Sequence, residues 1–149
     1  MRIAICSDEN YPLHAQIADD LTTRGHILAK YGSFSEKDGG PWALVAEQAA
    51  RAVAQGACAE GIFFCWTGTG ISIAANKIRG VRAALCNDAV TAAGARTWNH
   101  ANVLCLSNRL LSGDVAKEIF DAWFSTPFEE RGQEGVRALS EVEKRHCRL

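Results

Sequence analysis

Short apolar runs alternate with amphipathic stretches along the chain. Five runs have the length and composition of buried β-strands, and they lie at Arg2–Cys6, His26–Tyr31, Gly61–Cys65, Val81–Cys86 and Ala101–Leu106. Helical patterns follow these runs, from Pro12 to a cap at Gly25 and then at Pro41–Gln55, Ile71–Ile78, Ala89–Trp98 and Val115–Phe124. Strict alternation with short connections predicts an α/β protein: a three-layer α/β/α, Rossmann-like fold with a five-stranded parallel sheet.

One more helical stretch, Glu134–Lys144, lies beyond Pro127 and has no strand to cross over to. We therefore expect an extra C-terminal helix that packs on another subunit. The chain has no internal repeat and no low-complexity tract. Its 149 residues fit a single domain, 1–149, with a substantial core.

Composition narrows the class of protein. The chain is 48% apolar and 22% charged, which is typical of a soluble globular protein. With a net charge of −1, the chain lacks the excess of positive charge that is typical of proteins that bind nucleic acid or an anionic membrane. The apolar runs are too short to span a bilayer, and Arg2 leads directly into a strand with no leader before it. Six cysteines without metal-type spacing favour a reduced, cytoplasmic protein over a disulfide framework.

The segment Gly61–Lys77 carries the most chemical information. Its apolar strand ends at Cys65, at the carboxyl edge of the sheet, where open α/β folds bind ligands. Gly68 and Gly70 then allow a sharp turn that brings backbone N–H groups towards an anion or a developing oxyanion. A thiol beside such amides and the start of a helix ionises more readily than a free one. The pattern is typical of a catalytic or anion-binding turn.

Known nucleotide motifs do not explain this turn. The dinucleotide fingerprint needs a third glycine where Ile73 stands, and the Gly-Lys-Ser/Thr of the phosphate loop is missing. A purely structural turn with a buried cysteine remains the alternative, because free cysteines are often buried.

The motif resembles the ribose-5-phosphate isomerase B and galactose-6-phosphate isomerase family. The similarity covers most of the chain in order. It rests on Ile3-Ala-x-x-Ser7-Asp8, Phe34-Ser35, Gly61-x-x-x-Cys65, Thr67-Gly68-x-Gly70-x-Ser72-x-Ala74-Ala75-Asn76-Lys77, Gly80-Val-Arg82-Ala83-Ala84-Leu85-Cys86 and Asn99-x-x-Asn102-Val103-Leu104.

The resemblance implies a catalytic role for three residues. Cys65 matches the catalytic base, a thiolate that moves a proton between adjacent carbons of an opened sugar. Thr67 and the amides of the turn Gly68, Thr69 and Gly70 match the site that holds the enediolate oxygens. Asp8 matches an acidic residue that binds the sugar and assists ring opening. A base that titrates near neutrality suits this shuttle, and fixed N–H donors stabilise the developing oxyanion.

Other residues are implied to bind substrate. Asn99 matches a substrate-binding amide, and Arg109 an arginine near the substrate phosphate. In the family the active site lies between two subunits, so the resemblance implies a homodimer or homotetramer that binds a sugar or sugar phosphate. It requires neither a cofactor nor a metal.

Three positions beside the site depart from the family pattern. Glu9 stands where the family usually carries a histidine, Trp98 where it has its ring-opening histidine, and Trp66 where it has a glycine. We expect all three to face the substrate. For both tryptophans a place in the core or an interface is the alternative, and for Glu9 it is a solvated turn carboxylate.

The phosphate-binding arginines also differ. Arg131 matches the first of the family's C-terminal pair, but the second falls on Gly135, and Arg137 could replace it only if the local path shifts. A carboxylate at Glu9 would also repel a dianionic phosphate. Arg109 could instead form a surface salt bridge. We expect no catalytic role for His100, His14, His26 or His146, nor for Cys6, Cys58, Cys86 or Cys105.

Three functions follow from the sequence. The first is a cofactor-free aldose–ketose isomerase for a sugar phosphate of the ribose 5-phosphate type, with Cys65 as base. The second applies the same chemistry to a shorter or unphosphorylated sugar. The third is an inactive sugar-binding subunit, which the retained Cys65, Thr67 and glycines disfavour.

Overall fold

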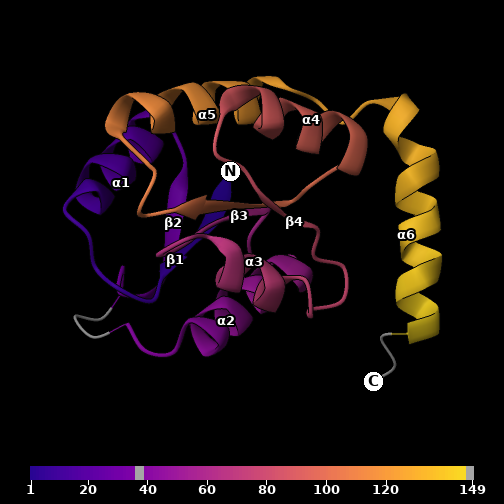
Figure 1. Ribbon diagram of the computed structural model, residues 1–149, viewed down its shortest axis with the longest axis horizontal. Coiled ribbons are helices and arrows are strands. Elements are labelled where there is room, and N and C mark those ends of the chain that lie inside the picture. Colours follow the sequence, from indigo (N-terminus) through magenta and orange to yellow (C-terminus); the bar gives the residue numbers. More distant parts are fainter. Residues whose placement is uncertain (36–38, 147–149) are drawn as a thin grey trace.

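The computed structural model describes residues 1–35 and 39–146, and it has the predicted three layers (Figure 1). Cys147 and Arg148 lie outside the described residues. The central sheet is five-stranded and parallel, with strand order β2-β1-β3-β5-β4. Its strands are β1 (Arg2–Ser7), β2 (Ile27–Gly32), β3 (Glu60–Cys65), β4 (Ala83–Leu85) and β5 (Val103–Ser107).

Helices cover both faces of the sheet. Helices α2 and α3 lie on one face, and α1, α4 and α5 on the other (Figure 1). The helices are α1 (Leu13–Thr23), α2 (Trp42–Ala54), α3 (Thr69–Ala75), α4 (Ala89–Asn99), α5 (Gly113–Ser125), the 3-10 turn η1 (Glu130–Gly132) and α6 (Gln133–His146). None of the helices in these described parts is long and apolar enough to cross a membrane.

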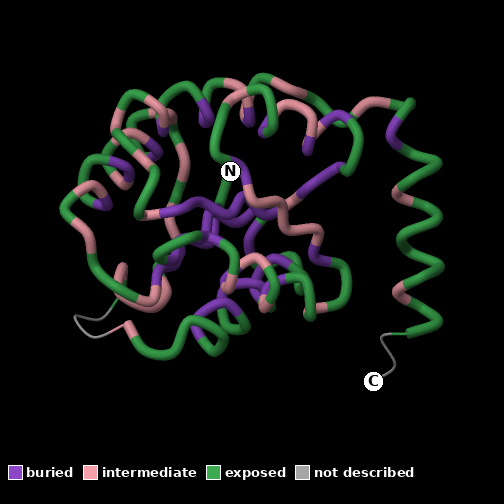
Figure 2. Tube along the Cα trace, viewed as in Figure 1, coloured by how far each residue is buried: buried purple, intermediate pink, exposed green. Residues whose placement is uncertain are grey.

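Strand alternation divides the core into two halves. On β1, Ala4 and Cys6 face α2 and α3, whereas Ile3 and Ile5 face the three-helix layer. The sequences of such strands are continuously apolar because both faces of the sheet are covered by helices. The purple, buried strands of Figure 2 lie between the two helical layers.

Several element boundaries differ from the prediction. β4 has three residues and lies at the edge of the sheet, so its side chains are only half-buried. In α1 the buried face comprises His14, Ile17 and Leu21, whereas Leu13 is only partly buried. Asp88 caps α4, because its side chain accepts a hydrogen bond from the Thr91 amide at 2.7 Å.

Helix α6 stands beside the three layers and buries none of its residues (Figures 1 and 2). Leu139 and Val142 are exposed on it, and its contacts with the rest of the chain are few. One of them joins Oε1 of Glu143 to the amide of Gly80 at 2.8 Å. This placement fits the expectation of a helix that packs on another subunit, which stays a prediction.

Candidate active site

The carboxyl ends of β1, β3 and β5 bring three segments of the chain together. In the sheet register Ser7 pairs with Phe64, and Cys65 pairs with Ser107. The turns that follow these strands therefore leave the sheet side by side. This is the edge at which parallel α/β sheets bind ligands.

Cys65 ends β3 with its side chain almost fully buried, 5% exposed, on the face covered by α2 and α3. The chain then turns at Gly68, whose φ of +77° lies in the left-handed region. A Cβ at Gly68 would lie 2.5 Å from Cδ1 of Leu85, so both the backbone angle and the space require glycine there.

The turn presents hydroxyls as well as amides. Oγ1 of Thr67 and Oγ1 of Thr69 are 2.6 Å apart, and both side chains are exposed. Helix α3 begins at Thr69, and the amides of a first helical turn have no intrahelical acceptor. Gly70 lies against the ring of Trp42, where a Cβ would come within 3.2 Å of the indole. Donors free to bind an oxyanion thus gather directly after Cys65.

The turn after β5 is hydrogen-bonded to the same segment. The amide of Asn108 donates to the carbonyl of Cys65, and that of Arg109 to the carbonyl of Trp66, each at 2.9 Å. The Ser107 hydroxyl also donates to the Trp66 carbonyl at 3.0 Å. Arg109 is exposed and its backbone lies next to the Cys65 turn, whereas its role in substrate binding stays a prediction.

Asp8 and Glu9 occupy the turn after β1. The amide of Glu9 donates to Oδ1 of Asp8 at 3.0 Å, and the Tyr11 hydroxyl donates to Oε2 of Glu9 at 3.0 Å. The Tyr11 ring stacks on Trp66, with centroids 6.2 Å apart and planes inclined by 22°. Burial raises the pKa of Asp8, and the charge of Glu9 raises it further. The two carboxylates and the two aromatic rings form one group beside Cys65.

Three residues at this edge were not among the predicted site residues. His14, Asn108 and Ser7 form a partly buried chain of hydrogen bonds beneath the turn after β1. His14 was expected to have no catalytic role. Its only sequence signal is a polar side chain on the buried face of an amphipathic helix, and Asn108 carries no signal at all.

The signal for His14 is thus its register with Ile17 on the buried face of α1, three residues apart. Asn108 is one residue from the predicted Arg109, and its contact with His14 joins positions 94 residues apart in the sequence. No local pattern reports such a contact.

The other predicted residues lie elsewhere in the chain. Trp98 and Asn99 end α4, which starts after the carboxyl end of β4 and runs back to the amino ends of the strands. They are exposed there, and Arg131 of η1 places its guanidinium 4.7 Å from the Trp98 ring centroid. Within one chain the structure therefore does not bring these three residues to Cys65. Arg137 donates to Oε1 of Gln133 at 3.1 Å, one turn back on α6.

A surface pocket of about 580 Å³ lies beside Trp98 and Asn99. The pocket is also lined by Asn76, Arg82 and Leu85, so it extends over the edge strand β4. A smaller pocket next to it, between α4 and α6, includes Gly135 where the family would place an arginine.

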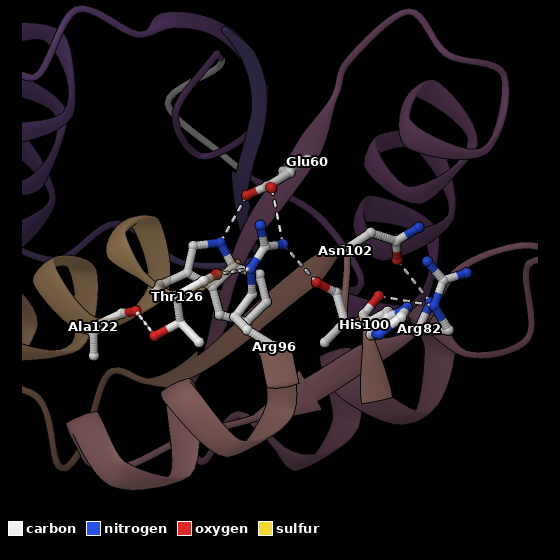
Figure 3. A network of polar contacts seen from close by, with 9 residues as sticks. Glu60, Arg82, Arg96, His100, Asn102, Ala122 and Thr126 are labelled. Atoms are coloured by element: carbon white, nitrogen blue, oxygen red, sulfur yellow. Dashed lines mark hydrogen bonds and ion pairs between the residues drawn. The ribbon is translucent and has the colours of Figure 1, made fainter. Parts of the chain in front are cut away.

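A buried ion pair supports the segment that leads to Arg131 (Figure 3). Nη1 of Arg96 lies 2.9 Å from Oε1 of Glu60, and the Trp123 indole donates to Oε2 of the same carboxylate at 2.7 Å. The guanidinium of Arg96 also lies 4.8 Å from the Trp123 ring and 4.3 Å from the Phe128 ring. It donates to the Thr126 carbonyl at 3.4 Å.

His100 contacts the segment directly before η1. Its ring stacks on Phe128 with centroids 4.7 Å apart, and its Nε2 lies 2.8 Å from the carbonyl oxygen of Glu129. A Cβ on Gly132 would approach the His100 ring to 2.9 Å, so η1 packs closely here. These contacts fix the segment that carries Arg131, which in turn pairs with Glu129.

The other cysteines in the part of the chain that the structure describes are core residues. Cys6, Cys58, Cys86 and Cys105 are free thiols with at most 2% exposure. Burial raises the pKa of Cys86 to about 12, and it raises those of Cys6 and Cys105 as well. Within residues 1–35 and 39–146, no three His, Cys, Asp or Glu side chains are grouped as a metal site.

Comparisons with known proteins agree with this geometry. Residues 3–140 match the family described as Ribose/Galactose Isomerase. Ribose-5-phosphate isomerase B of Escherichia coli is 37% identical over 141 residues, which is 94% of each chain. D-erythrulose-4-phosphate isomerase of Pectobacterium atrosepticum is 36% identical over 133 residues, 89% of this chain and 88% of that protein.

A solved structure shows the same fold. The ribose-5-phosphate isomerase B of Clostridium thermocellum superposes with a TM-score of 0.91 at 38% identity, covering 98% of this chain and 99% of that one.

Proposed function

We propose that this aldose–ketose isomerase, which belongs to the ribose/galactose isomerase family, acts on a sugar phosphate without a cofactor. The Cys65 thiolate is the base in this proposal. The observation that carries this proposal is the position of Cys65. It ends β3 beside a turn of free amides and hydroxyls, in the segment that the family shares. A sugar-phosphate substrate agrees with the names of both relatives.

The reaction moves one proton between neighbouring carbons. The Cys65 thiolate removes the proton from the carbon beside the carbonyl, and the electron pair of that C–H bond forms the C=C bond of an enediolate. The thiol then returns the proton to the former carbonyl carbon. The hydroxyl proton of the neighbouring carbon passes to the former carbonyl oxygen, and a new C=O bond forms at that neighbouring carbon, so that the aldose becomes a ketose. A single positioned base performs both transfers, and such a base contributes about 10² to 10⁴ in rate.

Negative charge develops on the carbonyl oxygen during the first transfer. The Thr67 hydroxyl and the amides of residues 68–70 lie directly after Cys65 and would donate to that oxygen. Fixed donors of this kind stabilise the transition state more than the ground state. Asp8 and Glu9, on the neighbouring turn, would bind sugar hydroxyls, with Tyr11 holding the Glu9 carboxylate in place.

A second copy of the chain would complete the site. Trp98, Asn99 and Arg131 lie at the other edge of the sheet from Cys65, so within one chain they cannot contact the same small substrate. The exposed Leu139 and Val142 of α6 offer an apolar surface for the partner. We propose a dimer, or a tetramer built from dimers, in which each active site combines Cys65 of one subunit with the α4–η1 region of the other.

A shorter, four-carbon substrate is a second candidate. A tetrose phosphate does not form the phosphorylated ring of ribose 5-phosphate and needs no dedicated histidine to open it. Trp98 at that position is therefore tolerable, and Arg131 stacked on it fills the space with aromatic and cationic groups. The Glu9 carboxylate adds negative charge at the turn after β1, which disfavours a phosphate group close to that turn. The D-erythrulose-4-phosphate relative supports this candidate.

The test is a panel of four-, five- and six-carbon aldoses, phosphorylated and free, assayed for ketose formation. Cys65→Ala and Cys65→Ser should lose at least about 10²-fold in kcat while the fold and ligand binding remain. Cys58→Ala is the matched control, because Cys58 is also buried but lies away from this edge.

One outcome would contradict the proposed base, and another would exclude the second candidate substrate. Full activity of Cys65→Ser on the best substrate would remove this thiol from the mechanism. A kcat/KM for ribose 5-phosphate of about 10⁴ M⁻¹s⁻¹ or more, matched by no tetrose, would exclude the four-carbon candidate.

A further inference from the structure

A closed circuit of hydrogen bonds lies beneath the turn that follows β1. The amide of Tyr11 donates to Nδ1 of His14 at 3.4 Å, and Nε2 of His14 lies 2.8 Å from Oδ1 of Asn108. Nδ2 of Asn108 donates to Oγ of Ser7 at 3.3 Å, and that hydroxyl donates to the carbonyl of Glu9 at 2.7 Å. The circuit thus begins and ends in the same turn.

The two ends of the circuit set the direction of every bond in it. A backbone N–H can only donate and a backbone carbonyl can only accept. Nδ1 of His14 must therefore carry a lone pair, so its Nε2 carries the proton and donates to Asn108. Asn108 must in turn accept through Oδ1 and donate through Nδ2, and the Ser7 hydroxyl must donate to the Glu9 carbonyl. The circuit closes only when His14 is the neutral Nε2–H tautomer.

We propose that His14 and Asn108 are positioning residues of the active site, and that the neutral His14 tautomer holds the turn of Asp8 and Glu9 against the strand end that carries Cys65. Asn108 joins the two parts directly, because its backbone amide also donates to the carbonyl of Cys65 at 2.9 Å. This inference rests on the proposed function, since it concerns the placement of the groups that would bind and deprotonate the sugar.

The surroundings of His14 favour its neutral form. The side chain is 4% exposed, and its ring packs 4.6 Å from Phe34, 5.0 Å from Phe64 and 5.6 Å from Tyr11, measured between centroids. None of these neighbours is charged, and burial lowers the pKa of His14 while the bond to Asn108 opposes that shift. Among residues 1–35 and 39–146, the titratable and charged side chains at this end of the packed elements are Cys6, Asp8, Glu9, Tyr11, Cys65 and Arg109.

Protonation of His14 would open the circuit. A second proton on the ring would sit on Nδ1 and face the amide of Tyr11, so two donors would oppose each other. The turn between Ser7 and Tyr11 would then lose one of its attachments. Other attachments would remain, among them the Ser33 hydroxyl, which donates to the Glu9 carbonyl at 2.9 Å, and the Ser33 amide, which donates to the Ser7 carbonyl at 2.8 Å.

The tautomer is tested directly by ¹H–¹⁵N NMR of the imidazole rings in the wild-type protein, with His14→Gln used to assign the signals. We expect His14 to be neutral at pH 7 with its proton on Nε2. A charged ring, or a proton on Nδ1, would overturn the proposal. This measurement needs no substrate, so it remains decisive even if the proposed isomerase reaction fails.

Kinetics test the positioning role. His14→Leu should lower kcat by about 10- to 100-fold, because a misplacement of about 1 Å at a reacting centre has effects of this size. His14→Gln keeps an N–H donor for Asn108 and should restore most of the rate. His26→Leu, at a histidine that packs on Phe124 away from this edge, is the matched control.

The pH profile separates positioning from a general structural role. In the wild type kcat should fall on the acid side as His14 becomes protonated, and this limb should move to lower pH in His14→Gln, since glutamine does not titrate. If His14→Leu does not fold, His14→Gln and Asn108→Asp carry the test. An unchanged acid limb in His14→Gln, or kcat within about two-fold of the wild type in Asn108→Asp, would overturn the positioning role.

Discussion

Arg96→Ala removes the cation from the buried ion pair with Glu60 and should lower the free energy of unfolding by about 3–5 kcal/mol. The side chains of the pair are 11% and 9% exposed, so water cannot replace the lost partner well. Of its partners among the described residues, the Glu60 carboxylate would keep the Trp123 indole, and the carbonyls of Ala101 and Thr126 would each lose a donor. In a chain of this size the change corresponds to a fall in Tm of about 6–20 °C.

Urea unfolding at fixed protein concentration measures this effect, with the slope m checked for constancy. Arg51→Ala is the matched control, because Arg51 pairs with Glu47 at 3.7 Å on the surface, with side chains 59% and 47% exposed. That variant should cost at most about 0.5 kcal/mol.

A double-mutant cycle with Glu60→Gln isolates the pair. The doubly substituted chain, Arg96→Ala with Glu60→Gln, leaves no unpaired charge and should be less destabilised than the sum of the single changes, by about 1–3 kcal/mol. The reasoning is refuted if Arg96→Ala costs no more than Arg51→Ala, or if the two changes at the buried pair are simply additive.

Three further predictions follow from other parts of the structure. Gly68→Ala, at a φ of +77° and against Leu85, should lower both stability, by about 1–3 kcal/mol, and kcat, and a wild-type urea midpoint would contradict the required turn. Truncation before Arg131 should weaken self-association and activity together, and sedimentation at the native size with full activity would exclude an exchanged C-terminal helix. Burial lowers the pKa values of His14 and His26, so the unfolded chain binds protons more readily than the folded chain. The free energy of unfolding should therefore fall as the pH drops below about 6.5. Urea midpoints at pH 7 and pH 5 measure this effect, and an equal or higher midpoint at pH 5 would contradict it.

The sequence by itself determined the fold class and half of the candidate site. Alternation of strand and helix predicted a parallel sheet with helices on both faces, because that arrangement alone buries both faces of such strands. Cys65 and Gly68 could be predicted from the local pattern because they are close in the chain, at a strand end followed by a glycine turn. The roles of Thr67 and Asp8 were implied by the family resemblance.

Tertiary structure decided which distant residues meet. The partnership of His14 with Asn108 joins a helix to a turn 94 positions away, and no local period reports it. Trp98 stands at the position of the family's ring-opening histidine, but only the direction of α4 places it at the opposite edge of the sheet from Cys65. Local spacing fixes which face of an element a side chain occupies, whereas strand order and helix direction decide which faces come together.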